Sequence, residues 1–181
     1  MVSSDAGFGD REAARSKYKP ELIRWLLIAE APPDSLDRFF YFERVMEKDF
    51  LYIETMRVLF PGVSEVDLRA RKRQYLQWFR EHGFYLIDVL DSPIDGCTRS
   101  RDRKEIVWTN RGAVLRKLEN LRTSITNETR IILVKASVYE LDAFLRRAGY
   151  IIANTSMVPF PSTGHQAEYR EQMATILNYP L

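Results

Sequence analysis

The amino-acid sequence predicts an α/β protein, a three-layer α/β/α sandwich around a central four-stranded parallel sheet. Four short, largely apolar segments alternate along the chain with segments of helical periodicity. Continuous apolar runs are typical of strands buried on both faces, and parallel neighbours need helical crossovers between them. The predicted strands are 25–29, 84–90, 130–135 and 150–157.

Helix signals account for the segments around the first two strands. An opening helical segment spans 11–24, and an aromatic-rich helical region spans 35–59. The next helix ends at Gly83 and begins at Ser64, where Asp67 completes a variant of the capping box.

Similar signals continue through the second half of the chain. An arginine-rich segment leads into a helix whose apolar residues lie within 107–121. Ser137 and Glu140 form a regular capping box, which predicts that Ser137 caps a helix ending at Gly149. The last helix carries an apolar stripe over 169–177.

Length and composition bound the class of protein. With 181 residues, 45% hydrophobic and 29% charged, the chain is predicted to form one domain over 1–181, with a helical extension over 1–20. No apolar run approaches the roughly 18 residues of a membrane span, and the N-terminal residues carry no signal-peptide core. We therefore expect a cytoplasmic monomer without a membrane partner.

The single cysteine, Cys97, limits redox and metal chemistry. One thiol excludes an intramolecular disulfide, a zinc site built on several thiolates and an iron–sulfur cluster held by one chain. A buried or incidental thiol is favoured over a nucleophile, because no histidine pattern supports the latter. No metal is therefore expected.

Basic side chains gather in two clusters, although the net charge is only +2. One cluster lies within 69–73, and the other comprises Arg99, Arg101, Arg103, Lys104 and Arg111. Clustered arginine and lysine favour phosphate binding and make a polyanion a candidate partner. The alternative is a solvated helix face, which charge runs on helices usually form.

A proline-stiffened loop follows the first predicted strand. Glu30 ends the apolar run and is followed by Ala31, Pro32 and Pro33, whose prolines restrict the loop to few conformations. Ligands bind outside the carboxyl ends of parallel strands, so Glu30 is a candidate functional acid. The alternative is a solvated glutamate at a proline turn.

A second proline-containing loop, 159–165, follows the last predicted strand and includes Phe160, Pro161, Ser162 and Thr163. Because both loops follow parallel strands, we expect them to form two walls of one cleft. Ser162 and Thr163 are predicted to cap the last helix and to leave its N-terminal amides facing an anion or phosphate. Ordinary capping beside a proline turn is the alternative.

Together the two loops resemble the motifs of the uracil-DNA glycosylase superfamily. Residues 29–33, Ala-Glu-Ala-Pro-Pro, are similar to the family's Gly-Glu-Ala-Pro-Gly motif, and residues 160–164, Phe-Pro-Ser-Thr-Gly, to its His-Pro-Ser motif. Motif order, spacing and the four-strand alternation agree over residues 20–180. Without cluster-binding cysteines, the chain resembles a branch of the family that has no iron–sulfur cluster.

The resemblance implies hydrolysis of the bond that joins a base to deoxyribose, on a nucleotide rotated out of the base stack, with no metal or cofactor. Glu30 then matches the family's acid, which orients the attacking water and stabilises the sugar cation. One ring among Phe39, Phe40 and Tyr41 is expected to stack on the base, with core packing as the alternative. His165 can hydrogen-bond the departing base or a phosphate, or only begin the last helix.

Four positions depart from the family pattern and bear on which base is recognised. Ala29 and Pro33 replace glycines, Pro33 cannot donate a backbone N–H, and Phe160 replaces the motif histidine. Asp88 stands where many members have a base-reading asparagine, and an ionised aspartate suits an exocyclic amine better than the carbonyls of uracil. The substrate-binding candidates are Ala31, Pro32, Pro33, Phe40, Tyr41, Asp88, Phe160, Pro161, Ser162 and Thr163.

The sequence leaves three functions open. The leading one is a DNA-base N-glycosylase that removes a damaged or deaminated base in base-excision repair, with double- or single-stranded DNA as its partner. The second is a non-catalytic nucleic-acid-binding member of the same fold. The third is a small-molecule hydrolase that uses Glu30 as general base, for which the chain carries no phosphate-binding glycine fingerprint.

Overall fold

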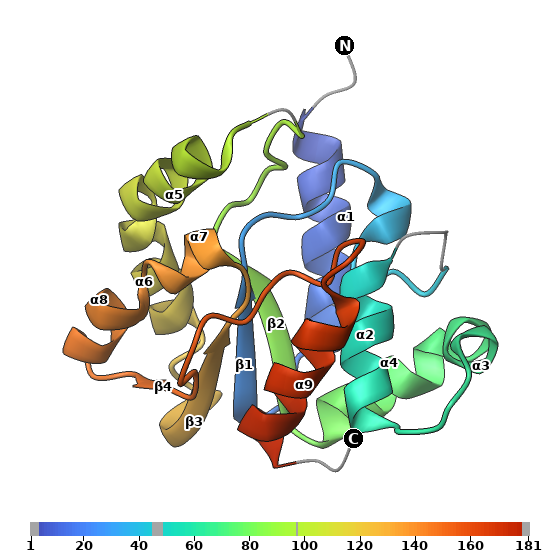
Figure 1. The fold of residues 1–181 in the computed structure, drawn as a ribbon. Helices are drawn as coiled ribbons and strands as arrows, with labels where there is room; N and C mark the ends of the chain where they lie inside the picture. The colour runs from blue at the N-terminus through green and yellow to red at the C-terminus, as the bar shows by residue number, and fades with distance from the viewer. Residues whose placement is uncertain (1–3, 45–48, 97, 179–181) are drawn as a thin grey trace.

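The structure, a computed structural model, describes residues 4–44, 49–96 and 98–178. Four parallel strands form one sheet in the order β2-β1-β3-β4, and helices cover both of its faces (Figure 1). The predicted α/β class with a four-stranded parallel sheet is confirmed. The strands are β1 (Ile23–Ala29), β2 (Phe84–Asp88), β3 (Ile125–Leu133) and β4 (Ile151–Ile152).

The helices divide between the two faces of the sheet. In Figure 1, α2, α4 and α9 lie on one side of the sheet, and α5, α6 and α8 lie on the other. Most of the crossovers use two short helices rather than one long helix. The helices are α1 (Ser4–Lys17), η1 (Leu36–Arg38), α2 (Phe50–Leu59), α3 (Glu65–Ala70), α4 (Lys72–Glu81), α5 (Ser100–Thr109), α6 (Arg111–Asn120), α7 (Ala136–Tyr139), α8 (Asp142–Arg147) and α9 (Gln166–Leu177).

Strand β1 is the structural centre of the sheet, and it positions Glu30. It pairs with β2 on one side and β3 on the other, so both of its edges are hydrogen-bonded. Leu26, Leu27 and Ile28 have no exposed surface, as the continuous apolar run predicts for a strand covered on both faces. The residue that follows, Glu30, is therefore held by a rigid element.

The fourth strand is much shorter than the predicted 150–157. Its ladder covers only Ile151 and Ile152, with one further bridge between Val134 and Val158. The side chain of Asn154 explains the interruption: its Oδ1 accepts from the Leu133 N–H at 2.7 Å, and its Nδ2 donates to the Leu133 carbonyl at 3.0 Å. An amide side chain thus replaces backbone pairing at this point.

The predicted helix over 35–59 is wrong in its first half. Only η1 and α2 are helical, and residues 45–48 lie outside the described residues. The buried rings of Phe39, Phe40 and Tyr41 pack in the core, and the Tyr41 hydroxyl accepts from the Leu86 N–H at 2.6 Å and donates to the Leu86 carbonyl at 3.2 Å. Leu86 lies on β2, the edge strand, so tertiary contacts with that edge replace helix formation.

The two capping predictions have opposite outcomes. Ser64 is the N-cap of α3, where its Oγ accepts from the Asp67 N–H at 3.1 Å, although the predicted helix breaks at Arg71 into α3 and α4. Ser137 does not cap a helix, because the N-cap of α7 is Lys135 and the Ser137 hydroxyl turns to Glu30. Both serines stand three residues before an acidic residue, but the Ser137 hydroxyl donates to the buried Glu30 carboxylate instead of capping the helix.

The start of the last helix also differs from the prediction. The N-cap of α9 is His165, and neither Ser162 nor Thr163 provides a side-chain cap. Instead, the His165 N–H donates to the backbone carbonyl of Ser162 at 2.9 Å, which makes a turn before the helix. Among the described residues, no helix is both long and apolar enough to cross a membrane.

Candidate functional site

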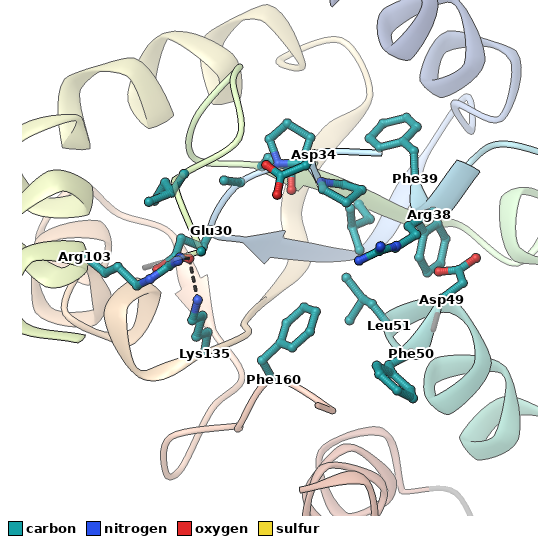
Figure 2. A pocket seen from close by; sticks show the side chains of 18 residues that line it. Glu30, Asp34, Arg38, Phe39, Asp49, Phe50, Leu51, Arg103, Lys135 and Phe160 are labelled. Atoms are coloured by element: carbon teal, nitrogen blue, oxygen red, sulfur yellow. Dashed lines mark hydrogen bonds and ion pairs between the residues drawn. The ribbon is translucent and has the colours of Figure 1, made fainter. Parts of the chain in front are cut away.

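A cavity of about 420 Å³ opens at the carboxyl ends of β1 and β2, bordered by the first proline loop (Figure 2). Its volume lies within the range typical of small-molecule sites. Phenylalanine rings and prolines make up much of the wall, with charged groups set among them. The lining residues are Glu30, Ala31, Pro32, Pro33, Asp34, Arg38, Phe39, Phe40, Asp49, Phe50, Leu51, Leu86, Asp88, Ile94, Gly96, Arg103, Lys135 and Phe160.

Glu30 is the most constrained acid of the cavity. It is 6% exposed, and three side chains donate hydrogen bonds to its carboxylate. Arg103 Nη1 lies 2.6 Å from Oε2, Lys135 Nζ contacts the same oxygen, and Ser137 Oγ lies 2.5 Å from Oε1. With one negative and two positive charges, this Glu30 cluster of Glu30, Arg103, Lys135 and Ser137 carries a net positive charge.

The surroundings keep the Glu30 carboxylate ionised. Burial by itself would raise the pKa of Glu30, because desolvation disfavours the charged form. Hydrogen bonds from Lys135 and Ser137 and the charges of Lys135 and Arg103 outweigh burial, so the pKa lies below its ordinary value. Glu30 therefore offers a permanent negative charge in the cavity at neutral pH.

Lys135 reaches Glu30 through an unusual backbone. Its φ of 89° and ψ of 145° lie in a region that residues other than glycine rarely adopt. Its backbone N–H donates to the Val158 carbonyl at 2.7 Å. Such a conformation costs about 1–3 kcal/mol and tends to occur where function requires it. The backbone is therefore strained just after β3, at the residue whose ammonium group lines the cavity.

Arg103 is fixed by its own neighbours. Its guanidinium donates to the carbonyls of Thr98 at 3.0 Å and Asp95 at 2.8 Å in addition to Glu30. These contacts tie α5 and the loop before it to the carboxyl end of β1. The planar fork of an arginine suits this role, because it donates in several fixed directions at once.

The far end of the cavity carries Arg38 and Asp49 (Figure 2). Asp49 and Lys72 form an almost fully buried ion pair, and burial raises the pKa of Asp49 while Lys72 partly offsets this effect. Arg38 is exposed, and no side-chain partner holds its guanidinium within the part of the chain that the structure describes. One cation thus remains available at the end opposite Glu30.

Helix α1 supports two walls of the cavity. Arg15 pairs with the buried Asp88 at 2.8 Å, and Arg11 donates to the carbonyl of Pro33 at 3.0 Å. Burial raises the pKa of Asp88, and the charge of Arg15 opposes that rise. Residues of the predicted N-terminal extension therefore hold both the end of β2 and the first proline loop.

The structure brings together many of the residues that the sequence singled out, from four separate parts of the chain. Those that line the cavity are Glu30, Ala31, Pro32, Pro33, Phe39, Phe40, Asp88, Arg103 and Phe160. Glu30, Asp88 and Phe160 therefore share one cavity.

Other predicted residues lie away from the cavity lining. Tyr41 packs in the core, and Pro161, Ser162 and Thr163 do not line the cavity. His165 is 57% exposed at its side chain and faces Glu168 at 3.4 Å. Arg99, Arg101 and Lys104 lie on or beside α5 at the surface, where Arg99 pairs with Asp102 and Lys104 with Glu140.

Four residues of the site were missed by sequence reasoning. Arg38 and Asp49 fall in the segment predicted as a helix, and Ser137 was predicted as a cap. Lys135 alone carried a usable signal, because it ends the predicted strand 130–135 and the carboxyl ends of parallel strands meet at one edge of the sheet.

Metal binding finds no support in the described ranges, where no group of three His, Cys, Asp or Glu side chains is arranged to hold an ion. Cys97 lies outside the described residues. The side chains paired with Glu30 are themselves cations, Arg103 and Lys135, and they would repel a metal ion at this position.

The fold and site define a class: an α/β protein with a parallel sheet that presents a buried, ionised carboxylate to an aromatic cavity at its carboxyl edge. Comparison with protein-family models, curated proteins and solved structures finds no match. The function is therefore argued from the site itself.

Proposed function

We propose that this chain is an N-glycosylase that hydrolyses the bond between a base and deoxyribose in DNA. The observation that carries the proposal is the ionised Glu30 facing a cavity walled by phenylalanine rings and prolines. Planar bases stack on aromatic rings, and a cavity of this kind suits a base rotated out of the stack.

The chemistry requires charge stabilisation more than a strong base. As the bond to the base breaks, the sugar gains positive charge, which a fixed carboxylate stabilises in a water-poor site. Ser137, Lys135 and Arg103 preorganise Glu30, so little reorganisation is needed when that charge develops. Glu30 also has acceptor capacity left for one water molecule, because an ionised carboxylate offers about four lone-pair sites.

Base release tests the proposal directly. Oligonucleotides carrying uracil, hypoxanthine, xanthine or an undamaged base are incubated with excess protein and then treated with alkali, which cleaves at abasic sites. We expect cleavage at one or more of these bases by the wild type and none by Glu30→Gln. Glu140→Gln, which changes an exposed glutamate on the surface, should retain activity.

Substrates that all remain intact with folded wild-type protein would contradict the glycosylase proposal. Free nucleosides incubated in the same way, with the released base measured directly, distinguish a small-molecule hydrolase, which would release base from them and not from oligonucleotides. Retained activity in Glu30→Gln would remove Glu30 from the catalytic role.

A second function, nucleic-acid binding without hydrolysis, is favoured by the charge of the Glu30 cluster. Two cations beside one carboxylate leave a net positive site, which suits a phosphate better than a sugar cation. This function predicts binding that weakens as salt increases, because phosphate contacts release counterions, with no cleavage after alkali.

A further inference from the structure

Lys135 has the chemistry that a departing base requires. When the bond between sugar and base breaks, the electron pair stays on the base, which leaves as an anion unless a group donates to it. Lys135 lines the cavity beside Phe160 and contacts Glu30 through Nζ (Figure 2). Its backbone conformation shows that the chain tolerates strain to keep the ammonium group there.

The other cations and His165 fit this role poorly. Among the described residues that line the cavity, the cationic side chains are Arg38, Arg103 and Lys135. A guanidinium stabilises an anion but does not give up its proton in proteins, whereas a lysine does both. His165 lies outside the cavity lining, with its exposed side chain facing Glu168.

We propose that Lys135 is a catalytic residue that stabilises the departing base and protonates it, with Glu30 returning the proton. This inference rests on the proposed glycosylase function and adds the leaving-group acid to it. Phe160, which replaces the histidine of the similar family motif, then has only a stacking role, and the acid comes from the end of β3.

The proton count closes without any further reactant. The C1′–N bond breaks, its electron pair goes to the base, and Lys135 Nζ transfers a proton to the base. Water oxygen bonds to C1′ and becomes strongly acidic as it does so, so even a weakly basic carboxylate accepts its proton. Glu30 passes that proton to the neutral Lys135 amine, with which it is in direct contact. The net reaction is hydrolysis, and both side chains recover their starting states.

The test measures single-turnover base release at saturating protein, using whichever base the wild type removes and a halogen-substituted, more acidic analogue of that base. Lys135→Met keeps the length of the side chain and removes the proton. Lys135→Gly removes the side chain and suits the positive φ, so it guards against a folding defect. Lys17→Met, at an exposed lysine paired with Glu43, is the matched control.

We expect both Lys135 variants to lose about 10²–10⁴-fold in rate on the parent base, as removal of a general acid does. The loss should shrink on the acidic analogue, because a better leaving group needs less protonation. Lys135→Arg should also be slow on the parent base, since it keeps the charge but not the transferable proton. Lys17→Met should match the wild type on both substrates.

Three outcomes would overturn the inference, and they are distinguishable. An active wild type with unchanged Lys135 variants removes Lys135 from the reaction. Equal losses on parent base and analogue, in variants with normal thermal unfolding, assign Lys135 a positioning role only. A wild type that releases no base from any oligonucleotide overturns the glycosylase function, and the inference with it.

Discussion

At the scale of single residues, the site depends on interactions between groups far apart in sequence. Glu30 is ionised because Lys135 and Ser137, more than a hundred residues away, donate to it against the cost of burial. The backbone of Lys135 also depends on distant contacts. Its positive φ is strained for a residue other than glycine, so the assembled site has to hold it in that conformation. Two predictions belong to these residues.

The first concerns acid stability. The folded-state pKa of Glu30 lies below its ordinary value, so its ionisation stabilises the fold above the pKa of the unfolded chain. That contribution is lost as the pH falls through the folded-state pKa. Urea unfolding should show Glu30→Gln less stable than the wild type at about pH 7, with the difference shrinking as the pH falls below about 4.3, the ordinary pKa of a glutamate. A difference that persists unchanged at low pH would contradict the charge-based explanation.

The second concerns backbone strain at Lys135. Both Lys135→Ala and Lys135→Gly remove the ammonium group, but only glycine adopts a φ of 89° without strain. We expect the free energy of unfolding of the glycine variant to exceed that of the alanine variant by about 1 kcal/mol or more. In helices and strands the order is usually the reverse, with alanine the more stable. Equal stabilities in chemical denaturation would show that the backbone is relaxed there.

At the scale of elements, α1 supports the cavity through residues that lie behind its lining. Its Arg15 pairs with Asp88 at the end of β2, and its Arg11 holds the carbonyl of Pro33. A buried pair of this kind is costly to break from one side, since it leaves an uncompensated charge. The helix therefore couples the N-terminal segment to two strand ends.

Arg15→Met should destabilise the protein by about 3–5 kcal/mol, because Asp88 then stays buried without its partner. Adding Asp88→Asn should recover part of the loss, because the remaining group is neutral. Denaturant titration of the single and double variants measures the coupling. Losses that simply add would argue against a direct interaction between the two side chains.

At two elements, tertiary contacts override the structure that the local sequence predicts. Ser64 and Ser137 both stand three residues before an acidic residue, yet only Ser64 caps a helix. Ser137 has a buried carboxylate within reach, and a charge-assisted hydrogen bond to that group outweighs a cap. In the same way, the Asn154 side chain ends β4 early by pairing with the backbone of Leu133.

At the scale of the whole molecule, the basic residues of α5 and the loop before it connect the surface to the cavity. Arg103 turns inward to Glu30, while Arg99 and Arg101 remain exposed. Arg99 and Arg101 thus place positive charge on the surface at the start of the helix that carries Arg103. This arrangement leads to a prediction about salt dependence.

The double variant Arg99→Gln with Arg101→Gln should weaken oligonucleotide binding to a similar extent for all sequences. It should also reduce the slope of log affinity against log salt by about 1 for each lost phosphate contact. Arg122→Gln, at an exposed arginine following α6, is the matched control and should bind as the wild type does. A slope that does not change in the double variant would place the nucleic-acid surface elsewhere.

The sequence by itself determined the four parallel strands, the burial of β1 and the position of Glu30 at its carboxyl end. These features depend on local periodicity and on the rule that parallel strands open at one edge. Tertiary structure alone decided that Lys135, Ser137 and Arg103 converge on Glu30, that Tyr41 packs as core, and that His165 lies outside the cavity lining. Contacts across such sequence separations arise from packing, which local pattern does not encode.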